Sequence, residues 1–525
     1  MTGALAHKSW GSRFSGVATL VGAFISGMLL QRGFAPANEW AFALLGLMSW
    51  LLLLERAPLR TQMVCLSLAF GLGWFTLGLQ WTANSMTEHG HLPWLVAQAG
   101  VVLLALLLSL SPVMTALLLG VRAQRSLCEY GLLWAFLFTL MEWLRGRAIL
   151  NFDWLNPAYL AVNMPLGGWA PIGGEFAVLL ALVLFSAALL VLMLGRAREK
   201  LFALLLAALL WGGGTLADKH EWSHMVGETY VEVMQPSLPV VDAFMRVDPK
   251  TRIEAVIEAR SAGLIRTKTP PLFALLPEGI INEPVDRLSL ATRAALAELL
   301  AQTRVPTFVN AFRREQGRFY NTTFVLDEQG ELGQVDKRHL VPFGEFVPSG
   351  ARWFINLLGI PMADLTPGSP EQATLDIQGT AVGLLICYEN LFSDTLRGYW
   401  HTGRAPTLVA LTANLGWFGE AVNAQHLQMS RLRAKEVARP IVAASNNGLS
   451  AVIRPDGTLS QVFDERGALY AVVSVPLAEG QPTPFVRVGT LPLIVLCAAI
   501  ALILLGFRKF SCQTRLSESG QGVLK

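Results

Sequence analysis

Long apolar stretches separated by short loops dominate the first 217 residues of the chain. A helix needs about 20 mainly apolar residues to span the roughly 30 Å of hydrocarbon in a bilayer. Since 53% of all residues are hydrophobic and only 15% are charged, the composition excludes an ordinary soluble protein. We predict a multi-pass α-helical membrane domain of about eight transmembrane helices, at 16–33, 39–55, 61–81, 94–121, 127–146, 174–195, 201–217 and 489–507.

The first apolar stretch admits a second interpretation, as a cleaved signal sequence. Lys8 and Arg13 precede it, and small residues follow at Ala35 and Ala37. Its apolar core is long for a signal sequence, so we favour a retained helix.

The positions of Lys and Arg predict the orientation of these helices, because positive side chains in short loops collect on the cytoplasmic side. With the N-terminus inside, one face collects Lys8, Arg13, Arg56, Arg60, Arg122, Arg125, Arg196, Arg198, Lys200, Arg508 and Lys509. Seven helices then place residues 218–487 outside the cytoplasm, which in a bacterium is the periplasm. Cleavage of the first stretch would leave this orientation unchanged.

One helix end carries an unusual set of charges, in M-E-W-L-R-G-R at 141–147. Glu142, Arg145 and Arg147 could pair with one another or meet lipid head groups. An interfacial anchor is an equally good interpretation.

The central part of the chain has the mixed composition of a globular domain. Strand-like runs alternate there with helix-like stretches at 249–264 and 286–303, which favours layered α/β structure. The strand-like runs lie at 230–234, 272–276, 307–312, 322–326, 381–386, 407–411, 440–444 and 449–453. We therefore predict three parts, an N-terminal transmembrane domain at 1–217, a globular domain at 218–487, and a C-terminal helix with a cytoplasmic tail at 488–525.

Reactive side chains follow three segments of this globular domain. L-F-A-L-L-P-E-G places Glu278 just past a strand, a loop marked by Pro and Gly carries Lys337 and Glu345, and A-V-G-L-L-I-C-Y-E-N ends at Cys387. Taken singly, each has an ordinary explanation as a turn residue, a surface charge or a small buried hydrophobe. Together, a carboxylate, an ammonium and a thiol supply the base, the cationic stabiliser and the nucleophile that covalent acyl chemistry requires.

The remaining cysteines and the histidines point to no metal centre. Cys387 has no disulfide partner in the globular part, because the other four cysteines fall in apolar spans or the C-terminal tail. The nearest approach to metal-ligand spacing is His89 with His91 in a short loop, which we interpret as solvated. No basic block interleaved with aromatics suggests nucleic acid.

Several stretches resemble a known family. The order Glu, Lys, Cys resembles the nitrilase or carbon-nitrogen hydrolase superfamily, whose domain is an α-β-β-α sandwich. The neighbouring stretches are similar to the apolipoprotein N-acyltransferase family over nearly the whole chain. They are H-L-V-P-F-G-E-F-V-P at 339–348, C-Y-E-N at 387–390, N-L-G-W-F-G at 414–419, Q-H-L-Q-M at 425–429 and S-N-N-G at 445–448.

The resemblance implies roles for individual residues. Cys387 becomes the nucleophile, Glu278 the general base and Lys337 the stabiliser of the oxyanion. The other matching positions are the supporting or substrate-binding residues Asn321, Glu345, Tyr388, Glu389, Trp417 and Phe418. One stretch departs from the family pattern, M-Q-P-S-L-P-V-V-D at 234–242, which puts in doubt an aromatic contact to lipid expected there.

The resemblance also implies a reaction without a cofactor. An acyl chain would move from the sn-1 position of a phospholipid such as phosphatidylethanolamine, through a Cys387 thioester, to the N-terminal diacylglyceryl-cysteine of an apolipoprotein. The enzyme would act in a bacterial inner membrane with its catalytic domain on the periplasmic side, and we expect a monomer.

Two other functions remain open from the residues. A membrane-tethered amidase or nitrilase could use the same three side chains, although one helix would suffice for tethering. A non-catalytic receptor or scaffold could retain a dead hydrolase domain, although the joint presence of Glu278, Lys337 and Cys387 argues against it.

Overall fold

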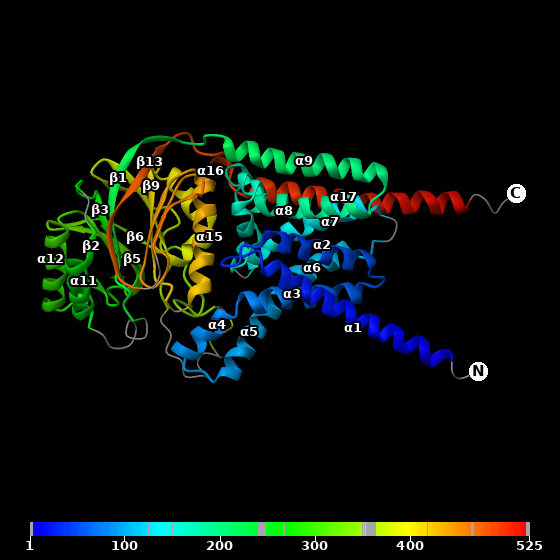
Figure 1. The fold of residues 1–525 in the computed structure, drawn as a ribbon, viewed down its shortest axis with the longest axis horizontal. Helices are drawn as coiled ribbons and strands as arrows, with labels where there is room; N and C mark the ends of the chain where they lie inside the picture. The colour runs from blue at the N-terminus through cyan, green and yellow to red at the C-terminus, as the bar shows by residue number, and fades with distance from the viewer. Residues whose placement is uncertain are drawn as a thin grey trace. The chain divides into compact units, whose positions relative to one another are not determined.

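The chain divides into two compact units, which are described separately. The computed structural model describes residues 4–122, 125–149, 151–239, 248–265, 268–348, 350, 352, 364–416, 418–463 and 467–520. The helical unit comprises Met1–His220 with Val488–Lys525, and the sheet unit comprises Glu221–Arg487. Figure 1 shows the elements of both.

The helical unit is built from apolar helices joined by short turns. Its elements are α1 (Ala4–Gln31), α2 (Trp40–Arg56), α3 (Arg60–Gly78), α4 (Trp81–Asn84), η1 (Ser85–His89), α5 (Trp94–Leu108), α6 (Leu110–Leu119), α7 (Leu127–Trp143), η2 (Leu144–Ile149), η3 (Pro157–Asn163), η4 (Pro165–Trp169), α8 (Ala170–Leu194), α9 (Ala197–Lys219) and α17 (Leu491–Gly520).

Five helical segments of the described chain are long and apolar enough to cross a membrane. They are Arg60–Gly78, Trp94–Leu119, Leu127–Arg147, Pro165–Leu194 and Ala197–Lys219. The apolar helices Gly16–Gln31 and Leu491–Gly506 are shorter. The predicted count of eight is therefore not confirmed. The helix α2 has 17 residues, about 25 Å at 1.5 Å per residue, which is less than the hydrocarbon thickness.

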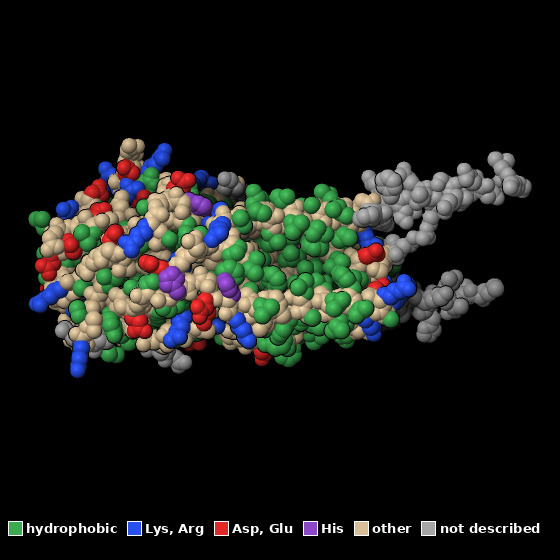
Figure 2. Space-filling model, turned by 90° about the horizontal axis from the view of Figure 1, so that it is seen from above, with side chains coloured by type: hydrophobic (Ala, Val, Ile, Leu, Met, Phe, Trp, Pro, Cys, Tyr) green, Lys and Arg blue, Asp and Glu red, His purple; other side chains and the backbone are tan. Residues whose placement is uncertain are grey.

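The surface of the helical unit is apolar. Figure 2 shows hydrophobic side chains gathered over it on the visible face. Leu103, Leu205, Leu209 and Leu216 are 68%, 62%, 62% and 72% exposed. Soluble proteins rarely expose contiguous apolar patches of such extent, so this surface is compatible with surrounding lipid.

The charges at the end of α7 are paired inside the helical unit. Glu142 and Arg145 are buried, and Nη2 of Arg145 lies 2.7 Å from Oε2 of Glu142. Arg145 also donates to the carbonyl oxygens of Phe152 and Trp154, and Arg147 pairs with Glu175. The pairing interpretation is confirmed for Glu142 and Arg145, and the interfacial-anchor interpretation is wrong for both, because neither side chain reaches the surface.

The sheet unit contains two sheets and the helices that cover them. Its elements are β1 (His224–Gln235), α11 (Pro249–Gly263), β2 (Leu264–Ile265), β3 (Phe273–Leu275), η5 (Val285–Arg287), α12 (Leu290–Thr303), β4 (Thr307–Glu315), β5 (Arg318–Asp327), β6 (Gly330–Asp336), β7 (Leu375–Ile377), β8 (Thr380–Ile386), η6 (Cys387–Leu391), α14 (Ser393–Arg397), η7 (Gly398–Trp400), β9 (Leu408–Ala413), α15 (Glu420–Val437), β10 (Ile441–Ser445), β11 (Ala451–Ile453), β12 (Leu459–Val462), β13 (Leu469–Glu479) and α16 (Pro484–Val488).

The strand order follows from pairings between segments far apart in the chain. One sheet has the order β2-β13-β1-β3-β4-β5-β6 and the other β12-β11-β10-β9-β8-β7. The first strand β1 pairs antiparallel with the last strand β13, from His224 opposite Glu479 to Gln235 opposite Leu469. The strands β8, β9 and β10 are parallel, so their carboxyl ends meet at one edge.

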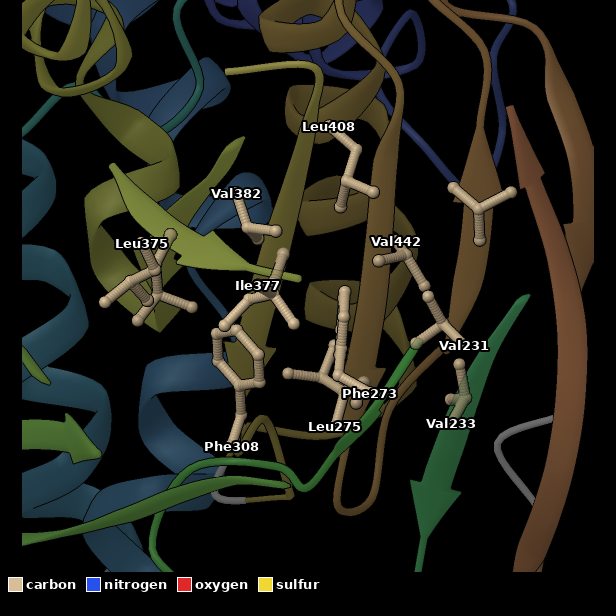
Figure 3. Close-up of a cluster of buried hydrophobic side chains, with 14 of the residues drawn as sticks. Val231, Val233, Phe273, Leu275, Phe308, Leu375, Ile377, Val382, Leu408 and Val442 are labelled. Atoms are coloured by element: carbon tan, nitrogen blue, oxygen red, sulfur yellow. The ribbon is translucent and has the colours of Figure 1, made fainter. Parts of the chain in front are cut away.

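The core of the sheet unit lies between the two sheets. Figure 3 shows Val231, Phe273 and Phe308 of one sheet meeting Val382 and Val442 of the other. A second cluster packs α11 and α12 on the outer face of the first sheet, and a third packs α14, α15 and α16 on the outer face of the second. The unit is therefore layered as helices, sheet, sheet and helices, as the α/β prediction requires.

Candidate active site

Cys387 stands at a sharp turn between the strand β8 and the short helix η6. Its φ is 50°, in the left-handed region that a residue with a Cβ rarely adopts. The neighbouring parallel strand β9 ends at Ala413, and the backbone of Asn414, the next residue, lies close enough to the Cys387 sulfur to lower the pKa of the thiol. The thiol is therefore held between two adjacent strand ends, with 6% of the residue exposed.

Glu278 lies in the turn that follows β3. The next residue, Gly279, has a φ of 77°, and its N–H donates to Oδ1 of Asn310 at 2.8 Å. The Glu278 carboxylate lies close enough to the Cys387 thiol to raise the pKa of that thiol. Two segments far apart in the sequence are thus brought together by the packing of the two sheets.

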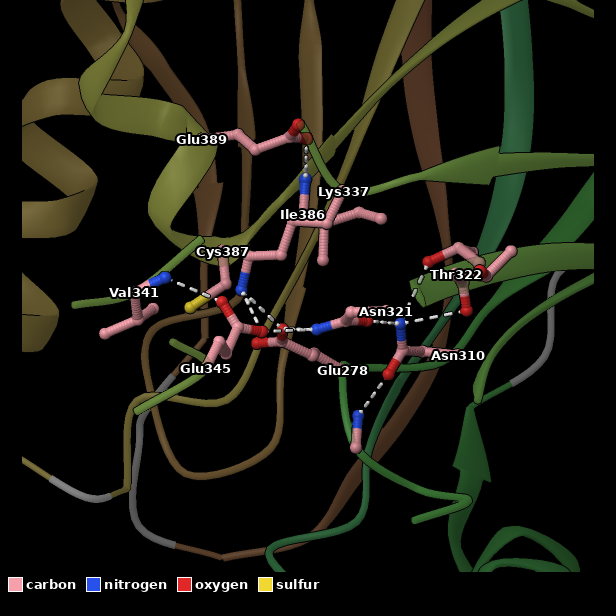
Figure 4. Close-up of polar contacts among 12 residues, drawn as sticks. Glu278, Asn310, Asn321, Thr322, Lys337, Val341, Glu345, Ile386, Cys387 and Glu389 are labelled. Atoms are coloured by element: carbon pink, nitrogen blue, oxygen red, sulfur yellow. Dashed lines mark hydrogen bonds and ion pairs between the residues drawn. The ribbon is translucent and has the colours of Figure 1, made fainter. Parts of the chain in front are cut away.

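A buried ammonium and an amide bridge two carboxylates beside this thiol (Figure 4). Nζ of Lys337 lies 2.8 Å from Oε1 of Glu278 and 3.0 Å from Oε1 of Glu345. Nδ2 of Asn321 donates to the same two oxygens at 2.8 and 2.7 Å. The other oxygen of Glu345 accepts the N–H of Val341 at 2.7 Å. The structure brings these four predicted side chains together with Cys387.

The two carboxylates keep Lys337 charged. Burial by itself would lower the pKa of this ammonium, but attraction to Glu278 and Glu345 outweighs it and raises the pKa above its usual value. Burial raises the pKa of Glu345, although Lys337 opposes that effect. The site thus holds a permanent positive charge close to the sulfur.

The thiol of Cys387 is protonated in the free site. Burial raises its pKa above the ordinary value, the Glu278 carboxylate raises it further, and Lys337 lowers it by less. Taken alone, the Lys337 ammonium favours the thiolate. Burial and the Glu278 carboxylate outweigh this effect, so the net shift of the thiol pKa is upward.

Glu389 joins the two segments that carry Lys337 and Cys387. Its Oε1 accepts the backbone N–H of Arg338 at 2.6 Å and Nε of Arg338 at 3.1 Å, and its Oε2 accepts the N–H of Ile386 at 2.9 Å. The fully buried carboxylate thus connects the residue after Lys337 to the residue before Cys387.

Two further predicted site residues are described, Tyr388 and Phe418. Tyr388 is buried, and its ring meets that of Phe392 edge to face at 5.5 Å. Phe418 is half-buried, and its N–H donates to the carbonyl of Leu415. Trp417 lies outside the described residues.

Part of the stretch that departs from the family pattern is described. Leu238 exchanges hydrogen bonds with the side chain of Asn446, and the hydroxyl of Ser237 donates to Asn447. Residues 240–242 lie outside the described part of the chain. The described portion therefore packs against the S-N-N-G stretch through polar contacts.

Two residues of the site were missed by sequence reasoning. Asn310 was visible as a polar residue inside the apolar run T-F-V-N-A-F, and it contacts Asn321. His426, within Q-H-L-Q-M, lies on α15 with Nε2 3.2 Å from the carbonyl oxygen of Cys387. Burial lowers the pKa of His426 to about 4, so the ring is neutral, and Nε2 carries the proton because a carbonyl only accepts.

Comparisons with known proteins identify the family of each half of the chain. The family model described as "Apolipoprotein N-acyltransferase N-terminal domain" matches residues 26–188, and the model described as "Carbon-nitrogen hydrolase" matches residues 270–485. The sheet unit therefore has the carbon-nitrogen hydrolase fold. Among solved structures, a carbon-nitrogen hydrolase from Helicobacter pylori G27 is 17% identical, with a TM-score of 0.34, and the match covers 47% of this chain and 90% of that chain.

Similar proteins extend over nearly the full length. The apolipoprotein N-acyltransferase of Ralstonia nicotianae is 32% identical over 495 residues, covering 91% of this chain and 92% of that protein. That of Chromobacterium violaceum is 30% identical over 511 residues, covering 93% and 94%. Since both halves of the chain match and the relatives are covered almost completely, the chain belongs to the apolipoprotein N-acyltransferase family.

Proposed function

We propose that Cys387 takes an acyl chain from a phospholipid as a thioester and delivers it to the N-terminal diacylglyceryl-cysteine of an apolipoprotein. Residues 218–487 are the catalytic domain in this proposal. The observation that supports it is the joint position of Glu278, Lys337 and Cys387: the ammonium pairs with the carboxylate at 2.8 Å, and both lie close enough to the thiol to shift its pKa. Phosphatidylethanolamine is the expected donor.

The first half of the reaction transfers the acyl group to sulfur. Because the thiol is protonated at rest, Glu278 removes its proton as the sulfur attacks the ester carbonyl. The developing oxyanion is stabilised by the charge of Lys337 in a site with little water. The tetrahedral intermediate then collapses, and Glu278 gives the proton to the departing alkoxide of the lysophospholipid.

The second half uses an amine as the nucleophile. An α-amino group titrates near about 8 and is partly neutral at physiological pH, whereas a lysine side chain near about 10.4 is almost wholly protonated. The neutral α-amine of the lipoprotein attacks the thioester carbonyl while Glu278 accepts its proton. The amide forms, the C–S bond breaks, and the proton returns to the sulfur, which completes a ping-pong cycle.

The helical unit accounts for the choice of substrates in this proposal. Both donor and acceptor are held in a bilayer by their acyl chains. Apolar helices would hold the enzyme in the same bilayer, where it can meet both substrates. We place the protein in the bacterial inner membrane, with the catalytic domain on the periplasmic side, from the distribution of Lys and Arg.

Intact mass spectrometry tests the proposal. The detergent-purified protein, beside a Cys387→Ala control, is incubated with phosphatidylethanolamine and then with a diacylated lipopeptide. We expect a mass gain of one acyl chain that requires Cys387 and disappears as the lipopeptide gains that chain.

Two other results would overturn the proposal. An adduct that is lost only to water would indicate a membrane-tethered hydrolase. The absence of any adduct, with lipid demonstrably bound, would indicate a non-catalytic scaffold.

A further inference from the structure

Asn310 lies in the strand β4, behind Asn321 as seen from the Glu278 and Glu345 carboxylates. It is 3% exposed, and the neighbouring strand β5 places Thr323 opposite it and Asn321 two residues earlier. Its side chain contacts both the turn that carries Glu278 and the amide of Asn321. A polar side chain in an otherwise apolar strand interior is costly unless its hydrogen bonds are satisfied.

The hydrogen bonds of Asn310 have a fixed direction. The N–H of Gly279 can only donate, so the atom of Asn310 that meets it at 2.8 Å must be the oxygen Oδ1. Nδ2 of Asn310 must then face the opposite way, where Oδ1 of Asn321 lies at 2.7 Å and the carbonyl oxygen of Thr322 at 3.1 Å.

The same direction continues through Asn321. Since its Oδ1 accepts from Asn310, its Nδ2 must face the two carboxylates, at 2.8 Å from Glu278 and 2.7 Å from Glu345. The reverse orientation would set an amide oxygen against two carboxylate oxygens. The N–H of Gly279 thus determines the orientation of the Asn310 amide, and Asn310 determines that of the Asn321 amide. As a result, a nitrogen faces the carboxylates of Glu278 and Glu345 (Figure 4).

We propose that Asn310 is a positioning residue for acyl transfer: it orients the Asn321 amide so that an N–H donor faces Glu278 and Glu345, and it holds the Glu278 turn through Gly279. The inference rests on the proposed acyl-transfer site. It adds a residue that does not touch the reacting atoms and acts on them through two neighbours.

An isosteric substitution separates orientation from packing. In Asn310→Asp one carboxylate oxygen still accepts the Gly279 N–H, but the ionised side chain has no hydrogen to give to Asn321. The Asn321 amide then loses its orienting donor and turns, so we expect the rate of thioester formation at pH 8 to fall about 10²-fold, the order that misplaced reacting groups cost.

Low pH should restore part of this loss in a way that a packing defect would not. When the carboxylate of the Asn310→Asp variant is protonated, the acid again offers a hydrogen to Asn321, and burial favours that form. We therefore expect the ratio of variant to wild-type rate to rise at least several-fold between pH 8 and pH 6. Asn310→Ala also loses the donor but cannot titrate, so its ratio stays low and flat.

Matched controls make each result decisive. Thr323→Val removes only the 3.3 Å bond that Asn310 makes to this hydroxyl and should stay within about twofold of the wild type. Cys387→Ala reports on the proposed function itself: if it still forms the adduct, the acyl-enzyme proposal fails irrespective of Asn310. If Cys387 is required and Asn310→Ala keeps the wild-type rate, the positioning role is overturned. Asn310→Ala also decides the question should Asn310→Asp fail to fold.

Discussion

At the scale of single residues, Cys387 is subject to opposing influences from its neighbours. Burial and the Glu278 carboxylate raise the pKa of the thiol, while Lys337 lowers it. The two neighbours therefore have separable effects on the reactivity of the sulfur, and these effects differ between simple alkylation and acyl transfer.

Glu278→Gln should make the thiol easier to alkylate while it abolishes acyl transfer. The substitution removes a negative charge that raises the thiol pKa and leaves Lys337 in place, so more thiolate exists at pH 8. We expect faster modification of Cys387 by iodoacetamide, measured by mass spectrometry, together with a loss of thioester formation of about 10²-fold or more. Alkylation that becomes slower would contradict the assigned electrostatics.

His426 should act by holding the backbone of Cys387. In His426→Gln the amide can still donate to the carbonyl of Cys387, so we expect most of the acylation rate to remain. His426→Leu removes the donor from a turn with a positive φ and should lower the rate about tenfold to 10²-fold, with the donor KM unchanged.

The pH dependence distinguishes this role from proton transfer. Since the pKa of His426 is lowered to about 4, the ring is neutral throughout the assay range. The ratio of variant to wild-type rate should therefore be constant between pH 6 and pH 9. A ratio that changes around pH 6 to 7 would indicate an acid–base role instead.

The charged and thiol side chains of the candidate site were easier to predict than the polar side chains behind them. Glu278 and Cys387 each follow a strand-like run, and Lys337 lies on a loop marked by Pro and Gly. All three carry a chemically distinctive group, which made them candidates. The role of Asn310 depends on which residue of β5 lies opposite β4 and on the direction of one backbone N–H. Neither is encoded in a local pattern.

At the scale of elements, Glu389 joins the two loops that carry Lys337 and Cys387. It accepts hydrogen bonds from Arg338 and from Ile386. Glu389→Gln would leave the buried guanidinium of Arg338 without its countercharge, and breaking a buried pair in this way costs about 3–5 kcal/mol. We expect a clear fall in the midpoint of thermal unfolding along with the activity.

A surface pair supplies the matched control for that experiment. Lys250 and Glu254 pair on the exposed face of α11, where an ion pair contributes at most about 1 kcal/mol. Glu254→Gln should leave the midpoint and the activity nearly unchanged. Equal effects of the two substitutions would refute a supporting role specific to Glu389.

Several elements were predicted from a local pattern, although the strand β13 (Leu469–Glu479) was missed. The apolar runs at 307–312, 381–386 and 440–444 became β4, β8 and β10. The helix α15 was missed because its inward face carries Asn423, Gln425 and His426, all buried, which obscures the usual alternation of apolar and polar positions. The edge strand β6 was missed because G-E-L-G-Q-V-D contains few strand-forming residues and is set by its partner β5.

At the scale of the whole molecule, the distribution of Lys and Arg predicts opposite sides for two exposed positions. A cysteine introduced at Gln329, in the sheet unit, should react with a membrane-impermeant maleimide on intact spheroplasts. A cysteine introduced at Arg198, near the start of α9, should react only after the membrane is opened. Wild-type protein controls for the native cysteines, and the reverse pattern would invert the proposed orientation.

The pairing of the first and last long strands of the sheet unit has a consequence for biosynthesis. The strand β1 lies inside its sheet, between β3 and β13, yet the residues of β13 leave the ribosome long after those of β1. The hydrogen-bonding edge of β1 must therefore stay open while almost all of the unit is made. A chain that stops before Leu469 would leave this edge as a template for another strand, and folding of the unit must wait for its final segment.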